Sequence, residues 1–204
     1  MITTLPLAYP FTGRWQIRNS PANRVPSHGT PAFSSAHAID FVPVDSLRRS
    51  APFTLASVFR PEPPDLFFGF RLPVLAPVTG RVVAVHDGDP DHHAFRGLPS
   101  VGYALTQRRR AADGWAGLAG NHVVIEVEQG AVVALCHLRR GSVTVTAGQA
   151  VTVGSPIGQC GNSGNSTEPH VHLQAMTHAD AARARALPIR FPDGLPRNGQ
   201  VLTV

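Results

Sequence analysis

The chain has 204 residues, of which 43% are hydrophobic, and carries a formal net charge of +5 at pH 7. That length suits one domain with elaborations, or a small pair, with a sizeable core. No segment reaches the roughly 18 apolar residues of a membrane span, and residues 1–13 lack the basic region and apolar run of a signal peptide. We therefore expect no membrane span. All 18 basic residues are arginine and are spread along the chain, so we expect no nucleic-acid partner either.

Proline is frequent in the first seventy residues, where only 38–44 has the pattern of a buried strand. Short runs rich in Val and Ile then predict strands over 73–86, 121–128, 131–137, 143–145, 150–153, 156–160 and 170–175, with a hairpin turn at 128–130. Helix is predicted only over 101–112 and 175–187. Many short strands between turns predict an all-β sandwich or barrel-like domain with little helix.

The strand rhythm also suggests how the chain is organised. We expect a loop-rich N-terminal segment (1–70) that contributes the strand 38–44, a β-sheet core (71–175), and a C-terminal extension (176–204). The polar stretch 87–120 interrupts the core, and we interpret it as an insertion over one end of the sheet.

The two cysteines, Cys136 and Cys160, lack the spacing of a zinc ribbon or a redox motif. They form one disulfide if their strands are neighbours, or they are small buried hydrophobic residues. We favour the second interpretation.

The stretch most indicative of chemistry is GNSGNSTEPHVH, residues 161–172. Its turn-forming residues run directly into a predicted strand on which His170 and His172 alternate with Val171 and Leu173. Alternate residues of a strand share a face, so the two imidazoles point the same way while the apolar side chains enter the core.

Two other positions combine polar chemistry with apolar surroundings. Asp40 lies in the middle of the apolar strand 38–44, where a carboxylate is costly unless it is paired or binds a metal. His137 ends the apolar strand 131–137. A histidine at a strand end is by itself usually only a polar terminal residue. Its place between the other motifs makes a functional role the better interpretation.

In order and spacing, several of these motifs resemble the lysostaphin-type (LytM family) zinc endopeptidases. The segments that carry the resemblance are APVTGRV (76–82), GNHVVI (120–125), ALCHL (134–138), GSPIG (154–158) and the stretch 161–172, and the likeness spans about 38–174. It implies an antiparallel β-sheet domain built on a duplicated hybrid motif, with Zn2+ in a groove. It also implies cleavage of peptide bonds in a peptidoglycan stem peptide or cross-bridge, which would place the protein outside the cytoplasm.

The resemblance also implies roles for single residues. It points to Asp40 and His172 as zinc ligands, and to His137 and His170 as the groups that act on water and the transition state. The chain has no His-Glu-x-x-His helix, so a helical glutamate is not expected to serve as general base.

The third ligand is the point of departure from the family pattern. The family usually has a histidine four residues before the aspartate, where this chain has Ala36. His37 lies three residues before Asp40, which on a strand means the opposite face. His28, in a loop with Gly and Pro twelve residues upstream, can fold back to Asp40, and we favour it.

If neither histidine reaches, the domain is catalytically degenerate and acts as a binding or regulatory module. A third candidate, a lipoyl-type carrier domain, requires a lysine for attachment. The chain has none, which excludes this candidate.

Overall fold

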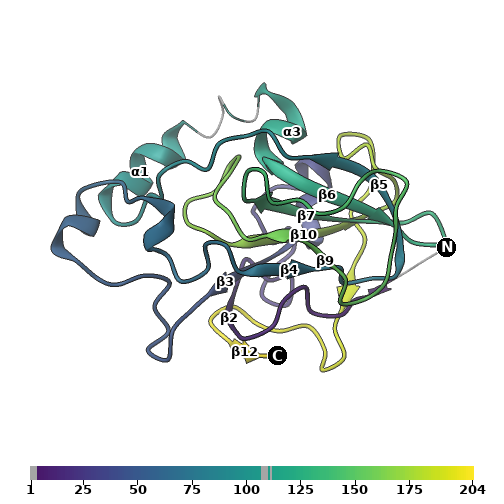
Figure 1. Ribbon diagram of the computed structural model, residues 1–204, viewed down its shortest axis with the longest axis horizontal. Helices are drawn as coiled ribbons and strands as arrows, with labels where there is room; N and C mark the ends of the chain where they lie inside the picture. The colour runs from purple at the N-terminus through teal and green to yellow at the C-terminus, as the bar shows by residue number, and fades with distance from the viewer. Residues whose placement is uncertain (1–3, 107–109, 111) are drawn as a thin grey trace.

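The fold is built on one large antiparallel sheet, which a computed structural model describes for residues 4–106, 110 and 112–204 (Figure 1). From one edge to the other the strands are β12 (Val201–Thr203), β2 (Arg14–Arg18), β3 (Ile39–Pro43), β10 (Val171–Met176), β7 (Val132–Leu138), β6 (Asn121–Glu126), β5 (Gly80–His86) and β8 (Ala150–Val151). Strands from the two ends of the chain therefore complete the same sheet as the middle of the chain. The all-β prediction is confirmed.

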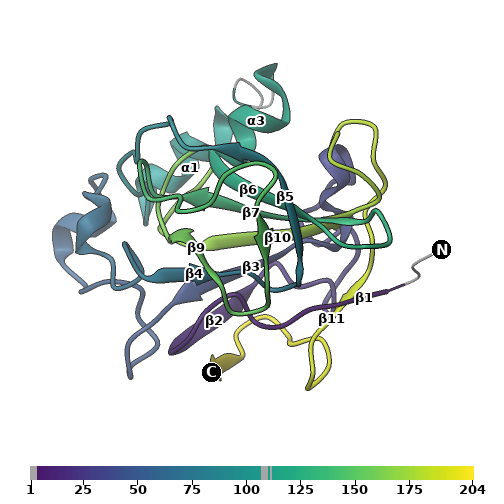
Figure 2. The ribbon, with the colours of Figure 1, turned by 45° about the vertical axis from the view of Figure 1, so that its right-hand side comes forward.

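Two small sheets accompany the large one (Figure 2). One pairs β4 (Pro73–Leu75) with β9 (Pro156–Gln159), and the other pairs β1 (Leu5–Pro6) in parallel with β11 (Ile189–Arg190). The described helices are the α-helices α1 (Leu98–Leu105) and α3 (Gly114–Ala119) and the 3-10 helices η1 (Ala32–His37), η2 (Leu55–Val58) and η3 (Pro64–Leu66). Within the described residues, no helix has the length and apolar character needed to cross a bilayer.

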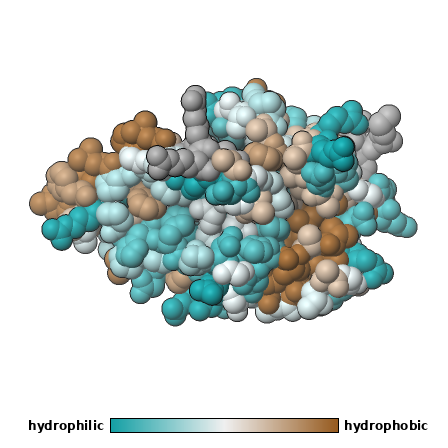
Figure 3. Space-filling model, turned by 90° about the horizontal axis from the view of Figure 1, so that it is seen from above, coloured by the Kyte–Doolittle hydropathy of each residue, from teal (hydrophilic) through white to brown (hydrophobic). Residues whose placement is uncertain are grey.

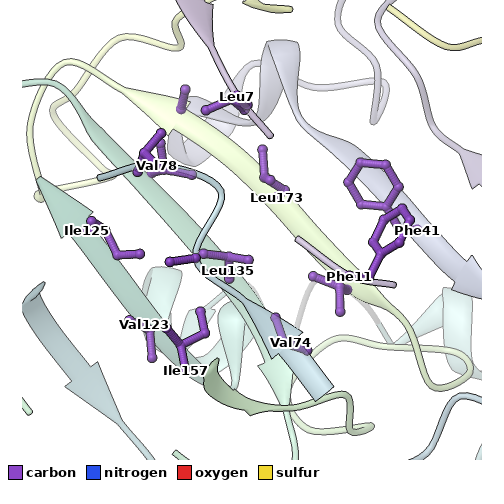
Figure 4. Close-up of a cluster of buried hydrophobic side chains, with 14 of the residues drawn as sticks. Leu7, Phe11, Phe41, Val74, Val78, Val123, Ile125, Leu135, Ile157 and Leu173 are labelled. Atoms are coloured by element: carbon purple, nitrogen blue, oxygen red, sulfur yellow. The ribbon is translucent and has the colours of Figure 1, made fainter. Parts of the chain in front are cut away.

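The two faces of the large sheet carry different side chains because strand residues alternate between them. One face holds the main core, in which the fully buried Ile39, Phe41 and Leu173 pack together with residues of β4, β6, β7 and β9 (Figure 4). The opposite face has a smaller apolar cluster, including Cys136 and Met176, and presents Asp40 and His172. Strand alternation thus delivers the polar side chains of β3 and β10 to one side of the sheet.

One end of the molecule exposes apolar side chains. Figure 3 shows this hydrophobic surface at its left-hand end, where Figure 1 places α1 and the segment around η2. Phe53, Leu55, Phe59, Leu98 and Val101 are each more than half exposed there.

Several element predictions need correction. The predicted helix over 175–187 is wrong: β10 continues to Met176, and the chain then turns back so that Met176 bridges Ala186. The strand β2 was missed, and the strand predicted over 143–145 does not form. The predicted strand 73–86 is two strands, while the hairpin turn between β6 and β7 is confirmed.

The helix predicted over 101–112 is found in part. Helix α1 covers Leu98–Leu105, with Pro99 in its first turn, and the predicted positions 107–109 and 111 lie outside the described residues.

The two cysteines are both fully buried and free. Cys136 belongs to the small cluster on one face of the sheet and Cys160 to the main core on the other. They behave as small apolar residues, as the interpretation we favoured predicts.

Candidate metal centre

Asp40 and His172 are direct neighbours across two central strands. They are paired in the antiparallel register of β3 and β10, so their side chains leave the same face of the sheet. The Nδ1 atom of His172 lies 2.9 Å from Oδ1 of Asp40. Asp40 is only 5% exposed, so its carboxylate can stay ionised only because neighbouring groups pair with it.

His28 reaches the same carboxylate from a loop. Its Nε2 lies 3.1 Å from Oδ2 of Asp40, and its Nδ1 lies 3.0 Å from the hydroxyl of Ser27. The Ser27 backbone N–H in turn donates to the Ala36 carbonyl, which ties the loop to η1. His37 ends η1 and is not part of this group.

Together, His28, Asp40 and His172 offer three ligand atoms that all lie within 4.8 Å of one another. Two imidazole nitrogens and one carboxylate oxygen are a donor set typical of catalytic zinc, which takes three protein ligands and keeps a further position for water or substrate. The chemistry of these residues therefore fits the metal that the sequence resemblance implies.

Gln174 fixes which nitrogen of His172 faces the carboxylate. Its Nε2 donates to the Phe33 carbonyl (3.0 Å), so its Oε1 faces His172 Nε2 at 3.0 Å and accepts that ring's N–H. The hydrogen-bond network thus leaves Nδ1 as the nitrogen of His172 that faces Asp40 and is placed to bind a metal. A histidine ligand oriented through its second nitrogen is a general feature of metal sites.

We predict that Gln174→Leu lowers zinc affinity by about 10- to 100-fold, because the His172 ring loses the acceptor that sets its tautomer. Competition with a chromophoric chelator measures the change. Gln129→Leu, at the exposed hairpin turn, is the control and should bind zinc as the wild type does. Equal affinity in both variants would show that Gln174 does not orient the ring.

His137 owes its position to a β-bulge. In the pairing of β6 with β7, Asn121 faces Leu138 and Val123 faces Leu135, so two residues of β7 oppose one of β6. His137 has a φ of 63°, uncommon for a residue with a side chain. Beyond the bulge, Leu138 packs in the main core. The centroid of the His137 ring lies 5.8 Å from that of the His172 ring.

His170 stands beside His137 at the start of β10, with ring centroids 4.6 Å apart. Its Nδ1 lies 2.8 Å from the Glu168 carbonyl, and Nδ1 of His137 lies 3.0 Å from the Ser163 carbonyl. Because a carbonyl only accepts, both rings carry their proton on Nδ1. Each Nε2 is then free to accept a proton, and that of His170 lies 3.8 Å from Asp40.

The charges of the site are set by competition between burial and neighbours. Burial alone would raise the pKa of Asp40, but the charges of His28 and His170 and the hydrogen bonds that the carboxylate accepts hold that pKa well below its usual value. Burial, the largest influence, would lower the pKa of His172, but the hydrogen bond to Asp40, the charge of that carboxylate and the hydrogen bond to Gln174 together raise it.

His137 responds in the opposite sense. Burial lowers the pKa of His137 well below its ordinary value, and the neighbouring rings of His170 and His172 add to the effect. Its imidazole is therefore neutral at physiological pH and available as a proton acceptor.

The loop 161–168 is clamped by the segment that interrupts the strands. Asp91 Oδ1 accepts the N–H of Asn162 at 2.7 Å, the Phe95 N–H donates to the Thr167 carbonyl at 2.7 Å, and the Asn165 N–H donates to the Leu118 carbonyl at 2.9 Å. These contacts fix the loop that leads into His170.

Gly164 and Gly120 touch backbone to backbone within this clamp. Gly164 has a φ of 68°, and a Cβ there would overlap Gly120 and Leu118. We predict that Gly164→Ala lowers the free energy of unfolding by about 3 kcal/mol or more, from strain and overlap combined. Gly130→Ala is the matched control, because Gly130 also has positive φ (82°) but open space around it.

Denaturant unfolding of the two variants separates these causes. The Gly130→Ala loss reports the positive φ alone, and the excess in Gly164→Ala reports the close approach. Equal losses would contradict a packing constraint at Gly164.

Sequence reasoning missed two polar neighbours of the site, Asn19 and Gln174. Asn19 Nδ2 donates to Asp40 Oδ2 at 2.7 Å from the end of β2, a strand that was not predicted. Gln174 could have been found, since it lies two residues after His172 and therefore on the same face of the strand.

The geometry defines a class of site: a cluster of two histidines and an aspartate, with two further histidines beside it, on one face of an antiparallel sheet. Comparison with known proteins agrees with the resemblance seen in the motifs. Residues 103–184 match the model of peptidase family M23, which confirms the likeness to lysostaphin-type peptidases. That segment contains His137, His170 and His172, while His28 and Asp40 precede it.

The solved structures that this chain matches include three that are named as M23, lysostaphin or LytM proteins. A variant of the catalytic domain of the prophage-encoded M23 protein EnpA from Enterococcus faecalis has 17% identity and a TM-score of 0.43, covering 75% of each chain. The catalytic domain of lysostaphin from Staphylococcus simulans has 17% identity and a TM-score of 0.42, covering 88% of this chain and 86% of that one. A putative glycyl-glycine endopeptidase LytM from Ruminococcus gnavus has 15% identity and a TM-score of 0.39, covering 74% and 42%.

Proposed function

We propose that this protein is a zinc-dependent metalloendopeptidase that cleaves peptide bonds in peptidoglycan, in a stem peptide or a cross-bridge. The observation that carries the proposal is the convergence of His28, Asp40 and His172 around one point, next to the paired rings of His137 and His170. Such a substrate is located outside the cytoplasm, and we expect the protein to act there.

In this proposal, His28 Nε2, one oxygen of Asp40 and His172 Nδ1 hold the zinc. The ion would lower the pKa of water and polarise the scissile carbonyl, which is the general contribution of catalytic zinc. Asp40 supplies the negative charge of the ligand set. Its low pKa keeps it ionised throughout the physiological range, so that it does not have to lose a proton when the metal binds.

His137 and His170 perform the proton transfers. With Nδ1 of each ring held by a carbonyl, the free Nε2 can take the proton of the attacking water. A ring protonated in this way becomes an N–H donor toward the oxyanion of the tetrahedral intermediate, and then returns the proton to the leaving amine. The two rings thus cover the base and acid steps without a helical glutamate.

The alternative function is a catalytically degenerate domain that binds or regulates. Ala36, at the position of the family's usual ligand, is the observation behind it. The contact between His28 and Asp40 argues against this alternative, because His28 can supply a third ligand from another part of the chain.

The test combines metal analysis with an assay on purified peptidoglycan fragments. We expect the protein to retain zinc through dialysis and to release new amino termini from the fragments. A strong chelator should abolish this activity, and added zinc should restore it. A protein that neither retains nor regains zinc would overturn the proposal, while a zinc-bound protein that binds fragments without cutting them would favour the degenerate domain.

A further inference from the structure

A hollow lies near the candidate metal centre. It has a volume of about 530 Å³ and includes Arg18, Arg48, Phe53, Phe95 and Glu168 in its walls. This size falls within the range of small-ligand pockets in proteins. Two aromatic walls and several arginines give it the character of a site for an anionic group on an apolar stem.

Two residues that line the hollow are direct neighbours of site residues. Arg18 of β2 is paired with Asp40 of β3, so both side chains leave the same face of the sheet. Glu168 also lines the hollow, and its carbonyl accepts the Nδ1–H of His170. A peptide lying across the metal centre would therefore meet this hollow next.

Two of its four arginines are already neutralised. Arg49 is paired with Asp45 at 2.7 Å, and Arg96 is bound to the Glu62 carboxylate by two hydrogen bonds of 2.6 and 2.7 Å. Neither of these two guanidinium groups has a free charge to offer a ligand.

Arg18 and Arg48 are different, since neither contacts a carboxylate in the part of the chain that the structure describes. The one acid in the walls, Glu168, accepts a hydrogen bond from Ser50. Two unpaired cations against one acid leave the hollow with a positive charge.

Arg48 is presented by a tight turn. The Asp45 N–H donates to the Arg49 carbonyl, the Arg48 N–H donates to the Asp45 carbonyl, and the Asp45 carboxylate caps the Leu47 and Arg49 N–H groups. Arg48 itself adopts a φ of 62°, a conformation uncommon for a residue with a side chain. Asp45 thus holds Arg49 and leaves Arg48 directed to the hollow as an unpaired cation.

We propose that this hollow is a substrate subsite that binds a free carboxylate of the peptide through Arg18 and Arg48, with Phe53 and Phe95 contacting its aliphatic part. The inference rests on the proposed function and adds a substrate class to it: acidic peptides in preference to amidated or neutral ones. The carboxylate can be the C-terminal group of a stem peptide or an acidic side chain, since both offer the same chemistry to a guanidinium.

The experiment uses one peptidoglycan stem tetrapeptide in four forms: unmodified, amidated at the C-terminus, amidated at the side chain, and amidated at both. Binding is measured by calorimetry on zinc-loaded His170→Ala protein, in which hydrolysis is slow, and cleavage is measured on the wild type. The variants Arg18→Gln and Arg48→Gln are compared with Arg14→Gln. Arg14 lies on β2 in the same alternation but about 13 Å along the strand, outside the hollow.

We expect the unmodified peptide to bind about tenfold more tightly than the doubly amidated one, as charge-assisted hydrogen bonds to a partly exposed site predict. Arg18→Gln and Arg48→Gln should each remove most of this preference, and Arg14→Gln should keep it. High salt should weaken binding of the unmodified peptide most. The singly amidated peptide that loses affinity identifies which carboxylate is bound.

Two outcomes separate this inference from the proposed function. Cleavage of all four peptides with equal affinity, or a preference that survives in Arg18→Gln and Arg48→Gln, would overturn the subsite while leaving the peptidase assignment in place. Carboxylate-dependent binding without any cleavage by the wild type would support the subsite and count against the peptidase.

Discussion

Replacing His28 with alanine should strip the protein of its zinc, whereas replacing His37 with alanine should leave it bound. His28 Nε2 lies 3.1 Å from Asp40 Oδ2 and within the 4.8 Å group of potential ligands, while His37 ends a 3-10 helix outside that group. Loss of one of three protein ligands should weaken zinc binding by more than the roughly 100-fold seen when a group supporting a ligand is removed. Metal content after dialysis, measured by plasma mass spectrometry, is the readout.

Asp40→Ala and His172→Ala are the positive controls, and each should lose zinc as His28→Ala does. Circular dichroism of all four variants checks that the sheet persists. The reverse result, with zinc lost in His37→Ala and kept in His28→Ala, would assign the third ligand to His37. Zinc retained in both variants would mean that neither histidine is a ligand.

The half of the site on β10 follows from local rules. Alternation along a strand places His170 and His172 toward one side and sends Val171 and Leu173 into the core, where both are fully buried. Asp40 follows in the same way, because its neighbours Ile39 and Phe41 are core residues. A carboxylate among such residues is informative because isolated burial would be costly.

The other half depends on contacts that no local pattern specifies. His28 reaches Asp40 only because its loop is tied to Ala36 and because β2 takes its place beside β3. The strand β2 was missed although Trp15 and Ile17 alternate with polar residues, since the pattern is only five residues long. The position of His137 depends on a β-bulge, and the extra residue of a bulge produces no periodic pattern from which the sequence could predict it.

The predicted helix over 175–187 failed for a related reason. Its alanines and arginines favour helix intrinsically. Tertiary contacts override that preference: the N–H of Leu187 donates to the Ala175 carbonyl, and the Ser34 hydroxyl donates to the carbonyls of Ala181 and Ala184. The segment therefore turns back along β10 and packs beside η1, which carries the Phe33 carbonyl that orients Gln174.

The second large effect is expected from the two histidines that do not belong to the ligand group. His137→Ala and His170→Ala should each lower kcat by about 10²- to 10⁴-fold, the usual contribution of a positioned general acid or base. Both should retain zinc, because neither ring is among the three potential ligands. This combination of lost turnover and retained metal distinguishes them from His28→Ala. His93→Ala, at an exposed position, is the control and should keep full activity.

The double variant His137→Ala/His170→Ala tests whether the rings act in the same step. Their ring centroids lie 4.6 Å apart, and in each ring a carbonyl holds Nδ1 so that Nε2 stays free, so we expect them to work as a unit. The effects of replacing groups that act together are strongly non-additive. The double variant should then be only slightly less active than the less active of the two single variants. Losses that multiply would instead assign the two rings to independent steps.

Because burial keeps the pKa of His137 low, the contribution of this ring to kcat should persist as the pH falls from 8 toward 6. In that range a fully exposed histidine would begin to lose its basic form.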